Sequence, residues 1–399
     1  MMRILQVNKL YSPWTGGIEN VVQEIAESLC GMPDIHSEVL VCRHKGIRTS
    51  ADVINGVPIT RIGSLGMALS LPVAPSFPFR LESLARGFDI VHVHVPFPLP
   101  LLCNWKRLKA NGTRLVIHFH SDIVRPLQKC LFRGLKALDR RFMEAADRII
   151  VTSEGLLNNS RALSPFRQKC RVVPLWIDLK ATVEPSAAEL LGTRQRYGVQ
   201  DGERVVLFVG RLVYYKGLEY LIEAASQLDA KILIAGDRPL RQSLQDRVRN
   251  VGLESKFRFL GTVTDAERST LYSLSDVFVL PSTGPSEAFG IVQLEAMAHG
   301  LPVVNTDLPT GVPSVSVHGE TGLTVPPRNS ELLRDSLNAI LSDTALRRRF
   351  SENASKRVHQ YSRPIVLEKI RSIYEELAPQ RCTTVSAGSL PTLRLATGR

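Results

Sequence analysis

The chain has 399 residues and the composition of an ordinary globular protein, with 44% hydrophobic and 22% charged residues. This length is enough for two domains that each bury a core. The formal net charge of +12 points to an anionic partner: a polyanion, an anionic membrane surface or a phosphorylated substrate. Six scattered cysteines form neither a C-x-x-C pair nor a zinc-ligand spacing, which indicates reduced thiols in a cytosolic protein.

No stretch of the sequence predicts a membrane span. The N-terminus lacks the long apolar core of a signal peptide, and three prolines interrupt the uncharged stretch at 62–79. If the protein meets a membrane, we expect it to lie on the surface.

The first predicted strand and helix, residues 4–7 and about 20–29, are joined by a loop with two adjacent glycines. A Gly-Gly step lets a ligand approach the backbone closely at the carboxyl end of a parallel strand. We therefore expect Gly16 and Gly17 to lie at a binding site.

Histidines mark the next two predicted strands, at 90–95 and 114–119. His92 and His94 share one face of the first strand and could bind a metal. Since no carboxylate or third ligand is evident nearby, we interpret them as core or cleft-edge residues. His120 follows the second strand at its carboxyl end.

Residues 125–142 form a predicted helix with an apolar stripe and a second, basic stripe beside it. Such a helix suits an anionic lipid surface, where each basic residue contributes about 1 kcal/mol. A packed helix with a solvated basic face is the alternative.

A second α/β series begins with a predicted strand at 205–209. Arg211 and Lys216 follow it in a loop that precedes a helix. Arg211 can bind two oxygens with its planar guanidinium, and Lys216 supplies a point charge. We predict that both side chains reach one pyrophosphate.

A further strand, loop and helix run from 277 to 301, with the helix expected at about 290–299. The amides at such a helix start attract an anion. Glu287 in the loop and Glu295 in the helix would accept hydrogen bonds from sugar hydroxyls. Together these features favour a ligand with phosphate between two sugars, which describes a nucleotide-sugar.

Two motifs carry a family resemblance. Glu287 and Glu295 are separated by seven residues and followed by AMA and GLPVV, and a G-R-L…K-G string surrounds Arg211 and Lys216. These strings resemble the retaining GT-B glycosyltransferases of family 4 (GT4). The resemblance is strong in the second half of the chain and thinner in the first. Where many members have Gly-Gly and a Glu, this chain has Thr310-Gly311 and Val312-Pro313, which weakens any assignment of an acceptor residue.

The resemblance implies roles for individual residues. Glu287 would contact the donor sugar and Glu295 the ribose, while Arg211 and Lys216 would neutralise the leaving diphosphate. His120 would contact the donor sugar. The amides of Phe289, Gly290 and Ile291 and the loop of Gly16 and Gly17 would contact the diphosphate. Gly236 and Val263 would contact the base.

The resemblance also implies the fold, an α/β protein of the GT-B class with two doubly wound, Rossmann-like domains that face a cleft. We expect an acceptor-side domain at 1–176 and a nucleotide-sugar domain at 177–362. A C-terminal helix at about 363–378 would cross back onto the first domain. Residues 379–399 are Ser/Thr/Gly-rich and predict a disordered tail.

The activity implied is transfer of a hexose with retention, without a metal or other cofactor, because Arg211 and Lys216 would act as the cation. The string at 286–313 is most similar to bacterial polysaccharide enzymes that use GDP-mannose or GDP-rhamnose and a lipid-linked saccharide acceptor. The protein would then be cytoplasmic and peripheral at the inner face of the membrane.

Four alternatives remain at this point, one of them a catalytically idle relative, although every charged motif position is intact. A UDP-hexose donor with another acceptor would keep the enzyme class. A basic nucleic-acid-binding protein is suggested by charge alone and lacks arginine repeats, interleaved aromatics and a helix-turn-helix pattern. A dinucleotide oxidoreductase would need a G-x-G-x-x-G string after a strand, which the sequence lacks.

Overall fold

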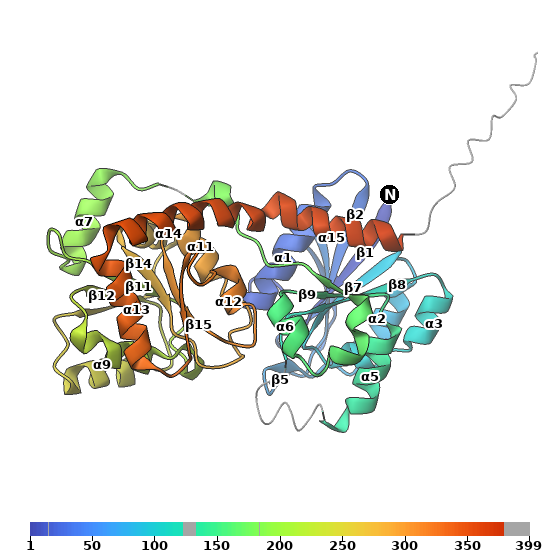
Figure 1. Ribbon diagram of the computed structural model, residues 1–399. Coiled ribbons are helices and arrows are strands. Elements are labelled where there is room, and N and C mark those ends of the chain that lie inside the picture. Colours follow the sequence, from blue (N-terminus) through green and yellow to red (C-terminus); the bar gives the residue numbers. More distant parts are fainter. Residues whose placement is uncertain (15, 123–132, 183, 379–399) are drawn as a thin grey trace, which may run out of the picture.

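A computed structural model describes residues 1–14, 16–122, 133–182 and 184–378. Two twisted sheets lie side by side in it, each covered by helices (Figure 1). We call the half built on the eight-stranded sheet the N-lobe and the half built on the six-stranded sheet the C-lobe. The predicted fold class, with two Rossmann-like halves, is confirmed.

The N-lobe sheet has the strand order β10-β9-β8-β7-β1-β2-β4-β3 and is parallel except for β3. Its strands are β1 (Met2–Val7), β2 (Ile35–Cys42), β3 (Ser50–Ile54), β4 (Val57–Ile62), β7 (Ile90–Val95), β8 (Arg114–Phe119), β9 (Arg148–Val151) and β10 (Cys170–Val172). A separate two-stranded ribbon pairs β5 (Met67–Ala68) with β6 (Leu71–Pro72).

The C-lobe sheet is parallel throughout, in the order β13-β12-β11-β14-β15-β16. Its strands are β11 (Val205–Val209), β12 (Lys231–Ala235), β13 (Phe257–Gly261), β14 (Val277–Leu280), β15 (Val303–Thr306) and β16 (Gly322–Val325). The central strands are apolar runs, because both faces of a helix-covered parallel sheet are buried.

Among its parallel strands, each sheet reverses its strand order at one place, between β1 and β7 in the N-lobe and between β11 and β14 in the C-lobe. Loops that leave adjacent strands at such a place diverge to opposite faces of the sheet and open a crevice at the strands' carboxyl ends. The topology therefore directs attention to the loops after these four strands.

Helices cover both sheets. Those of the N-lobe are α1 (Gly17–Cys30), α2 (Phe77–Ala85), α3 (Trp105–Ala110), α5 (Lys136–Ala145) and α6 (Glu154–Asn159). Those of the C-lobe are α7 (Ala187–Tyr197), α8 (Leu218–Ala224), α9 (Arg241–Asn250), α10 (Asp265–Leu274), α11 (Val292–Ala298), α12 (Val312–Val315), α13 (Ser330–Ser342) and α14 (Thr344–Arg357). Short 3-10 turns are η1 (Leu99–Leu102), η2 (Ser164–Lys169), η3 (Leu179–Ala181), η4 (Tyr214–Lys216), η5 (Ala225–Gln227) and η6 (Val358–Tyr361).

The last helix, α15 (Arg363–Leu377), begins beside the C-lobe and lies against the N-lobe (Figure 1). Its apolar side chains, including Val366 and Ile370, pack in the same buried cluster as Ile4 of β1 and Ile90 of β7. The chain passes between the lobes twice, near Ile177 and near Ser362. Backbone hydrogen bonds pair Ile177 with the start of α15, so these two segments run side by side.

Candidate functional site

The C-lobe part of the site lies where the sheet reverses its order. The loop after β11 brings Lys216 to the loop after β14, where its Nζ lies 2.5 Å from Glu287 Oε2. Both side chains are about nine-tenths buried, and Ser282 Oγ also donates to Glu287 Oε2 (3.1 Å). The Thr283 amide donates to the Tyr215 carbonyl (2.8 Å), which ties the two loops together.

Arg211 shares this loop but is exposed. In the part of the chain that the structure describes, no hydrogen bond or ion pair holds its guanidinium. Burial raises the pKa of Tyr215, and the Glu287 carboxylate raises this pKa further, while the charges of Lys216 and Arg211 lower it. The structure thus brings the two predicted cations into one neighbourhood.

The helix near the motif is shorter than predicted. It begins at Val292 rather than at Gly290, which has a φ of +72°. Such a backbone conformation favours glycine and keeps this residue outside the helix. Phe289 is buried and meets the Tyr361 ring edge-on, whereas the Ile291 side chain is 38% exposed. A buried amide pair supports the turn, because Asn305 Nδ2 donates to Gln293 Oε1 (2.8 Å).

Glu295 is held within the C-lobe. Arg268 Nε lies 3.1 Å from its Oε2, and the buried Tyr272 hydroxyl donates to the same oxygen (2.9 Å). Glu295 lines a hollow of about 250 Å³ together with N-lobe and crossing residues such as Glu24 and Trp176. Both partners bind Oε2, so Oε1 can accept a hydrogen bond from a ribose hydroxyl.

Gly236 and Val263 lie in the loops after β12 and β13. The Gly236 amide donates to the Gly261 carbonyl (2.8 Å), and a Cβ on Gly236 would lie 1.9 Å from the Gly210 carbonyl oxygen. Only glycine allows this close approach to the loop that carries Arg211. Val263 is half-buried and packs against the C-lobe core.

The N-lobe glycines lie at the start of α1. Gly16 is the N-cap, with extended backbone, and a Cβ there would lie 2.3 Å from Glu19 Oε2. Gly17 has open space on its Cβ side. Glu19 is itself buried and paired with Lys9 (3.4 Å), so this loop already holds a carboxylate near its amides.

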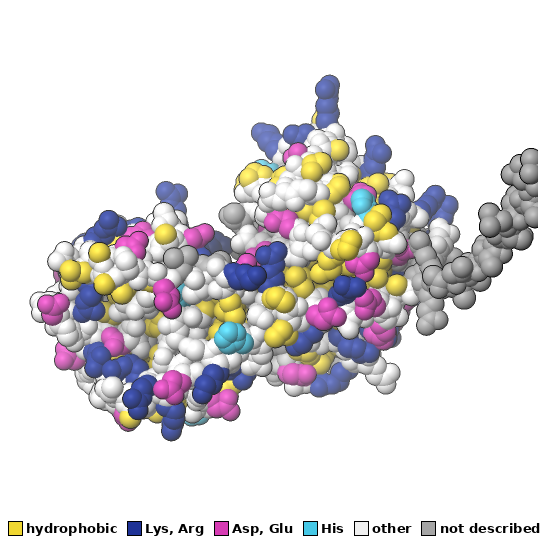
Figure 2. Space-filling view, turned by 90° about the horizontal axis from the view of Figure 1, so that it is seen from above, with side chains coloured by type: hydrophobic (Ala, Val, Ile, Leu, Met, Phe, Trp, Pro, Cys, Tyr) yellow, Lys and Arg dark blue, Asp and Glu magenta, His cyan; other side chains and the backbone are white. Residues whose placement is uncertain are grey.

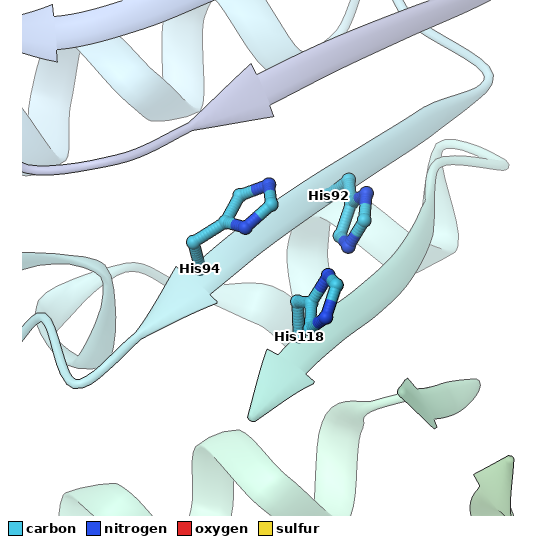
Figure 3. Close-up of side chains that lie close together, drawn as sticks. All are labelled: His92, His94 and His118. Atoms are coloured by element: carbon cyan, nitrogen blue, oxygen red, sulfur yellow. The ribbon is translucent and has the colours of Figure 1, made fainter. Parts of the chain in front are cut away.

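His120 lies in a buried cluster of four histidines. His92 and His94 of β7 and His118 of β8 extend from one face of the sheet, as Figure 3 shows for these three side chains. The His120 ring stacks on that of His118, with centroids 4.1 Å apart. Burial lowers the pKa of His92 and of His120 to about 3, and lowers those of His94 and His118 as well. The four rings are therefore neutral at physiological pH.

This cluster corrects one expectation. A third potential ligand does lie beside His92 and His94, since nitrogens of these two and of His118 lie within 4.8 Å of one another. Both nitrogens of His94 are already hydrogen-bonded, however, and the three ring planes differ by only 1–28°. The group also contains no carboxylate to offset a buried divalent charge. The interpretation of His92 and His94 as core residues fits these contacts.

A cavity of about 610 Å³ opens at the carboxyl end of β8, on the face of Phe119 and opposite to the face that carries the His120 ring. Apolar side chains such as Phe97 and Met143 form much of its wall, and Pro285 comes from the C-lobe, so the cavity faces the gap between the lobes. Its polar lining residues are Ser121, Asp122, Asp139, Asn159 and Arg161.

These polar residues were not predicted from the sequence as part of the site. Ser160 Oγ donates to Asp122 Oδ1 (2.8 Å), and burial raises the pKa of Asp139. Asp122 could have been found, since it stands two residues after His120 at the end of a parallel strand. Asp139 and Arg161 lie on α5 and just after α6, where no motif marks them.

The predicted basic helix at 125–142 is only partly within the described residues, which exclude 123–132. In the described part, Leu135, Leu138 and Phe142 pack into the N-lobe core. In these residues the apolar stripe therefore covers the core, as the alternative of a packed helix with a solvated basic face expects, and contact with a membrane stays a prediction. Its basic residues, Arg133, Lys136, Arg140 and Arg141, are exposed.

None of the described helices is both long and apolar enough to cross a membrane. On the face shown in Figure 2, lysine and arginine side chains are interspersed with acidic ones over both lobes rather than gathered in one stripe. This view gives no support to a nucleic-acid-binding face.

Comparisons with known proteins agree with the geometry. Residues 15–181 match the family model described as Glycosyltransferase Family 4, and residues 192–357 match that of Glycosyl transferases group 1. The chain is 32% identical over 365 residues to the D-rhamnosyltransferase WbpZ of Pseudomonas aeruginosa, covering 90% of this chain and 92% of that one. It is 29% identical over 374 residues to the O-antigen chain mannosyltransferase C of Escherichia coli, covering 90% and 94%.

Solved structures share the fold. Anabaena Alr3699/HepE in complex with UDP superposes with a TM-score of 0.76 at 22% identity, covering 94% of this chain and all of that one. The predicted similarity to bacterial mannosyl- and rhamnosyltransferases of polysaccharide synthesis is confirmed by the relatives' names. The chain therefore belongs to the family 4 glycosyltransferases and has the GT-B fold.

Proposed function

We propose that this glycosyltransferase moves mannose or rhamnose from a GDP-sugar onto a lipid-linked saccharide during polysaccharide synthesis, with retention at the anomeric carbon. The observation that carries the proposal is the buried Lys216–Glu287 pair beside the exposed Arg211 at the β11/β14 crevice. The names of the rhamnosyl- and mannosyltransferase relatives support the choice of sugar.

Charge stabilisation is the chemical task of the C-lobe. As the bond from the anomeric carbon to the diphosphate oxygen breaks, negative charge grows on the diphosphate. Arg211 and Lys216 stabilise that charge, together with amides near Gly290, so no metal ion is required. Glu287 accepts hydrogen bonds from the sugar, and His120 contacts it from the N-lobe.

The acceptor hydroxyl attacks the same face of the sugar from which the diphosphate leaves. Its oxygen bonds to the anomeric carbon, and its proton passes to the departing phosphate oxygen, so no side-chain base is assigned. The 610 Å³ cavity suits such an acceptor: its apolar wall fits a sugar face or the start of a lipid, and Asp122 and Asn159 offer hydrogen bonds to hydroxyls.

The donor is tested by a thermal-shift screen of GDP-mannose, GDP-rhamnose, UDP-glucose and ADP-glucose, followed by transfer to a lipid-pyrophosphate-linked sugar. We expect GDP-sugars to stabilise the protein most and to give product with a retained anomeric configuration by NMR. EDTA should leave the rate unchanged. Transfer from UDP-glucose alone would instead establish the UDP-hexose alternative, and an inverted product would overturn retention.

Peripheral attachment to the cytoplasmic membrane face is also proposed, through the exposed basic residues of α5 and the turn before it. A variant with Lys136, Arg140 and Arg141 changed to glutamine should cosediment less with phosphatidylglycerol vesicles than wild type. The matched control changes Arg238, Arg249 and Arg348, which are exposed on the C-lobe, and removes the same charge. Equal loss in both variants would refute a specific attachment surface.

A further inference from the structure

Five hydrogen-bonding side chains form one chain across the buried face of the N-lobe sheet. Gln6 of β1, His92 and His94 of β7, His120 after β8, and Tyr374 of α15 take part. Gln6 lies opposite His92 in the strand register. The same face is apolar at the amino ends of these strands and polar towards the carboxyl ends.

The direction of the chain follows from the hydrogen-bonding capacity of each group. Gln6 Nε2 donates to the Tyr374 hydroxyl (3.2 Å), and Gln6 Oε1 accepts from His94 Nε2 (3.0 Å). Neutral His94 with a proton on Nε2 has a lone pair on Nδ1. That lone pair accepts from His120 Nε2 at 2.9 Å.

His120 is thereby fixed in one tautomer. Its proton lies on Nε2, and Nδ1 has no hydrogen bond to any residue that the structure describes. The His120 ring lies on the sheet face of His94 and His118, opposite to the face of Phe119, and 6% of the residue is exposed. A neutral imidazole with a free Nδ1 lone pair accepts a hydrogen bond from a hydroxyl and donates none there.

We propose that Gln6, His94 and Tyr374 are positioning residues that hold His120 as its Nε2–H tautomer, with Nδ1 as the hydrogen-bond acceptor for a substrate hydroxyl. This inference rests on the proposed function for the identity of the hydroxyl, that of the donor sugar. The proposal gives α15 a second role besides packing, because this helix supplies Tyr374 to the series of hydrogen bonds that ends at His120.

The tautomer is tested first without substrate. Long-range proton–nitrogen NMR of protein with labelled histidines, assigned by a His120→Gln sample, should show the His120 proton on Nε2 and no titration between pH 8 and 6. A proton on Nδ1, or titration of His120 in that range, overturns the proposal. This readout does not depend on transfer, so a failure of the proposed function is distinguishable from a failure of this inference.

Activity provides the second test. Gln6→Met removes both amide hydrogen bonds at similar volume, and Tyr374→Phe removes only the hydroxyl. Gln6→Met should lower kcat by about tenfold or more, with the donor KM changed less than about twofold, since a lost supporting hydrogen bond misorients the ring it holds. Tyr374→Phe should change kcat in the same direction by less, because Gln6 still bonds to His94 but its amide can now flip, which leaves only part of the molecules with the other tautomer.

The matched control is Ile4→Val, which lies on the same strand and the same buried face as Gln6 but makes only apolar contacts. It should lower thermal stability without a change in kcat or in the His120 tautomer. Equal kcat for Gln6→Met and Ile4→Val would overturn the positioning role. Should Gln6→Met fail to fold, the tautomer of Tyr374→Phe, expected as a mixture, decides in its place.

Discussion

The carboxyl-terminal edges of the two sheets bring different chemistry to the gap between the lobes. The C-lobe edge carries charge, in the Lys216–Glu287 pair and in Arg211. The N-lobe edge carries neutral histidines whose pKa values burial has lowered. A diphosphate needs charged partners such as Arg211 and Lys216, whereas sugar hydroxyls can hydrogen-bond to neutral histidines.

The two lobes also meet the cost of burying polar groups differently. The C-lobe pairs opposite charges, so removal of one partner leaves a buried charge without compensation. The N-lobe keeps its histidines uncharged and links them by hydrogen bonds. The stability of the C-lobe should therefore be sensitive to mutations that remove a charge, and the stability of the N-lobe to acid.

Acid should produce the largest effect, and in the N-lobe first. A histidine whose folded pKa is lowered contributes stability above its unfolded pKa, near 6.5, and that stability is lost as pH falls towards the folded pKa. Burial lowers the pKa of all four histidines, so each should lose stability as pH falls from 7.5 to 5.5, and all four losses fall in the N-lobe. Hydrogen exchange followed by mass spectrometry should show N-lobe peptides losing protection over this range while C-lobe peptides keep it. Parallel loss in both lobes would contradict the comparison.

Lys216→Ala should lower kcat by about 100- to 1,000-fold, the usual cost of removing one preorganised group from a developing charge. The control is Lys231→Met, because Lys231 is also a buried lysine of the C-lobe, bonded to the Ser255 carbonyl and remote from the two loops. Both variants should lose thermal stability, but only the first should lose turnover. A similar turnover in the two would remove Lys216 from the site.

Arg211→Ala should lower kcat by about 10- to 100-fold with no change in melting temperature, since an exposed group without a partner contributes little to folding. Arg211→Lys should recover only part of the rate, because an ammonium does not bind two oxygens side by side. Arg238→Ala, at an arginine that is 93% exposed on the same lobe, serves as the control. Full activity of Arg211→Ala would count against a diphosphate at this loop.

The smallest effects concern the contact between the lobes. A Cβ on Gly155 of α6 would lie 2.1 Å from the Thr310 carbonyl oxygen of the C-lobe, so Gly155→Ala should push the lobes apart and lower kcat/KM several-fold. Gly192→Ala, in α7 with open space around the added carbon, should leave activity intact and raise stability by about 0.5–1 kcal/mol. Small-angle scattering compares the shapes of the two variants, and equal shapes with equal activity would refute the contact's role.

The sequence predicted the C-lobe site better than the N-lobe site, for a physical reason. Lys216 and Glu287 lie in two loops that follow adjacent parallel strands, so motif and topology together bring these two side chains into contact, and Arg211 lies in the loop of Lys216. His120 bonds to His94 and, through it, is linked to Gln6 and Tyr374, and only the packing of β1, β7 and α15 brings these residues together.

Local sequence patterns did not predict three features: the packing of one apolar stripe, the start of α11 and the third histidine of the cluster. The apolar stripe that includes Leu135 and Leu138 has the same helical periodicity whether it faces lipid or the protein core. In the structure these two side chains pack against the N-lobe core. The helix near the motif begins late because Gly290 adopts a positive φ that no periodicity reveals. The third histidine of the cluster was missed because it comes from a neighbouring strand.

The central claim is that Arg211 and Lys216 bind the diphosphate of one nucleotide. Isothermal titration of GDP and of GMP into wild type and into the Arg211→Ala/Lys216→Ala variant tests it most directly, because the two ligands differ by one phosphate. We predict that wild type binds GDP at least about tenfold more tightly than GMP, an advantage of about 1.4 kcal/mol or more, and that the double variant loses this preference. An equal preference for GDP in both proteins would contradict the account.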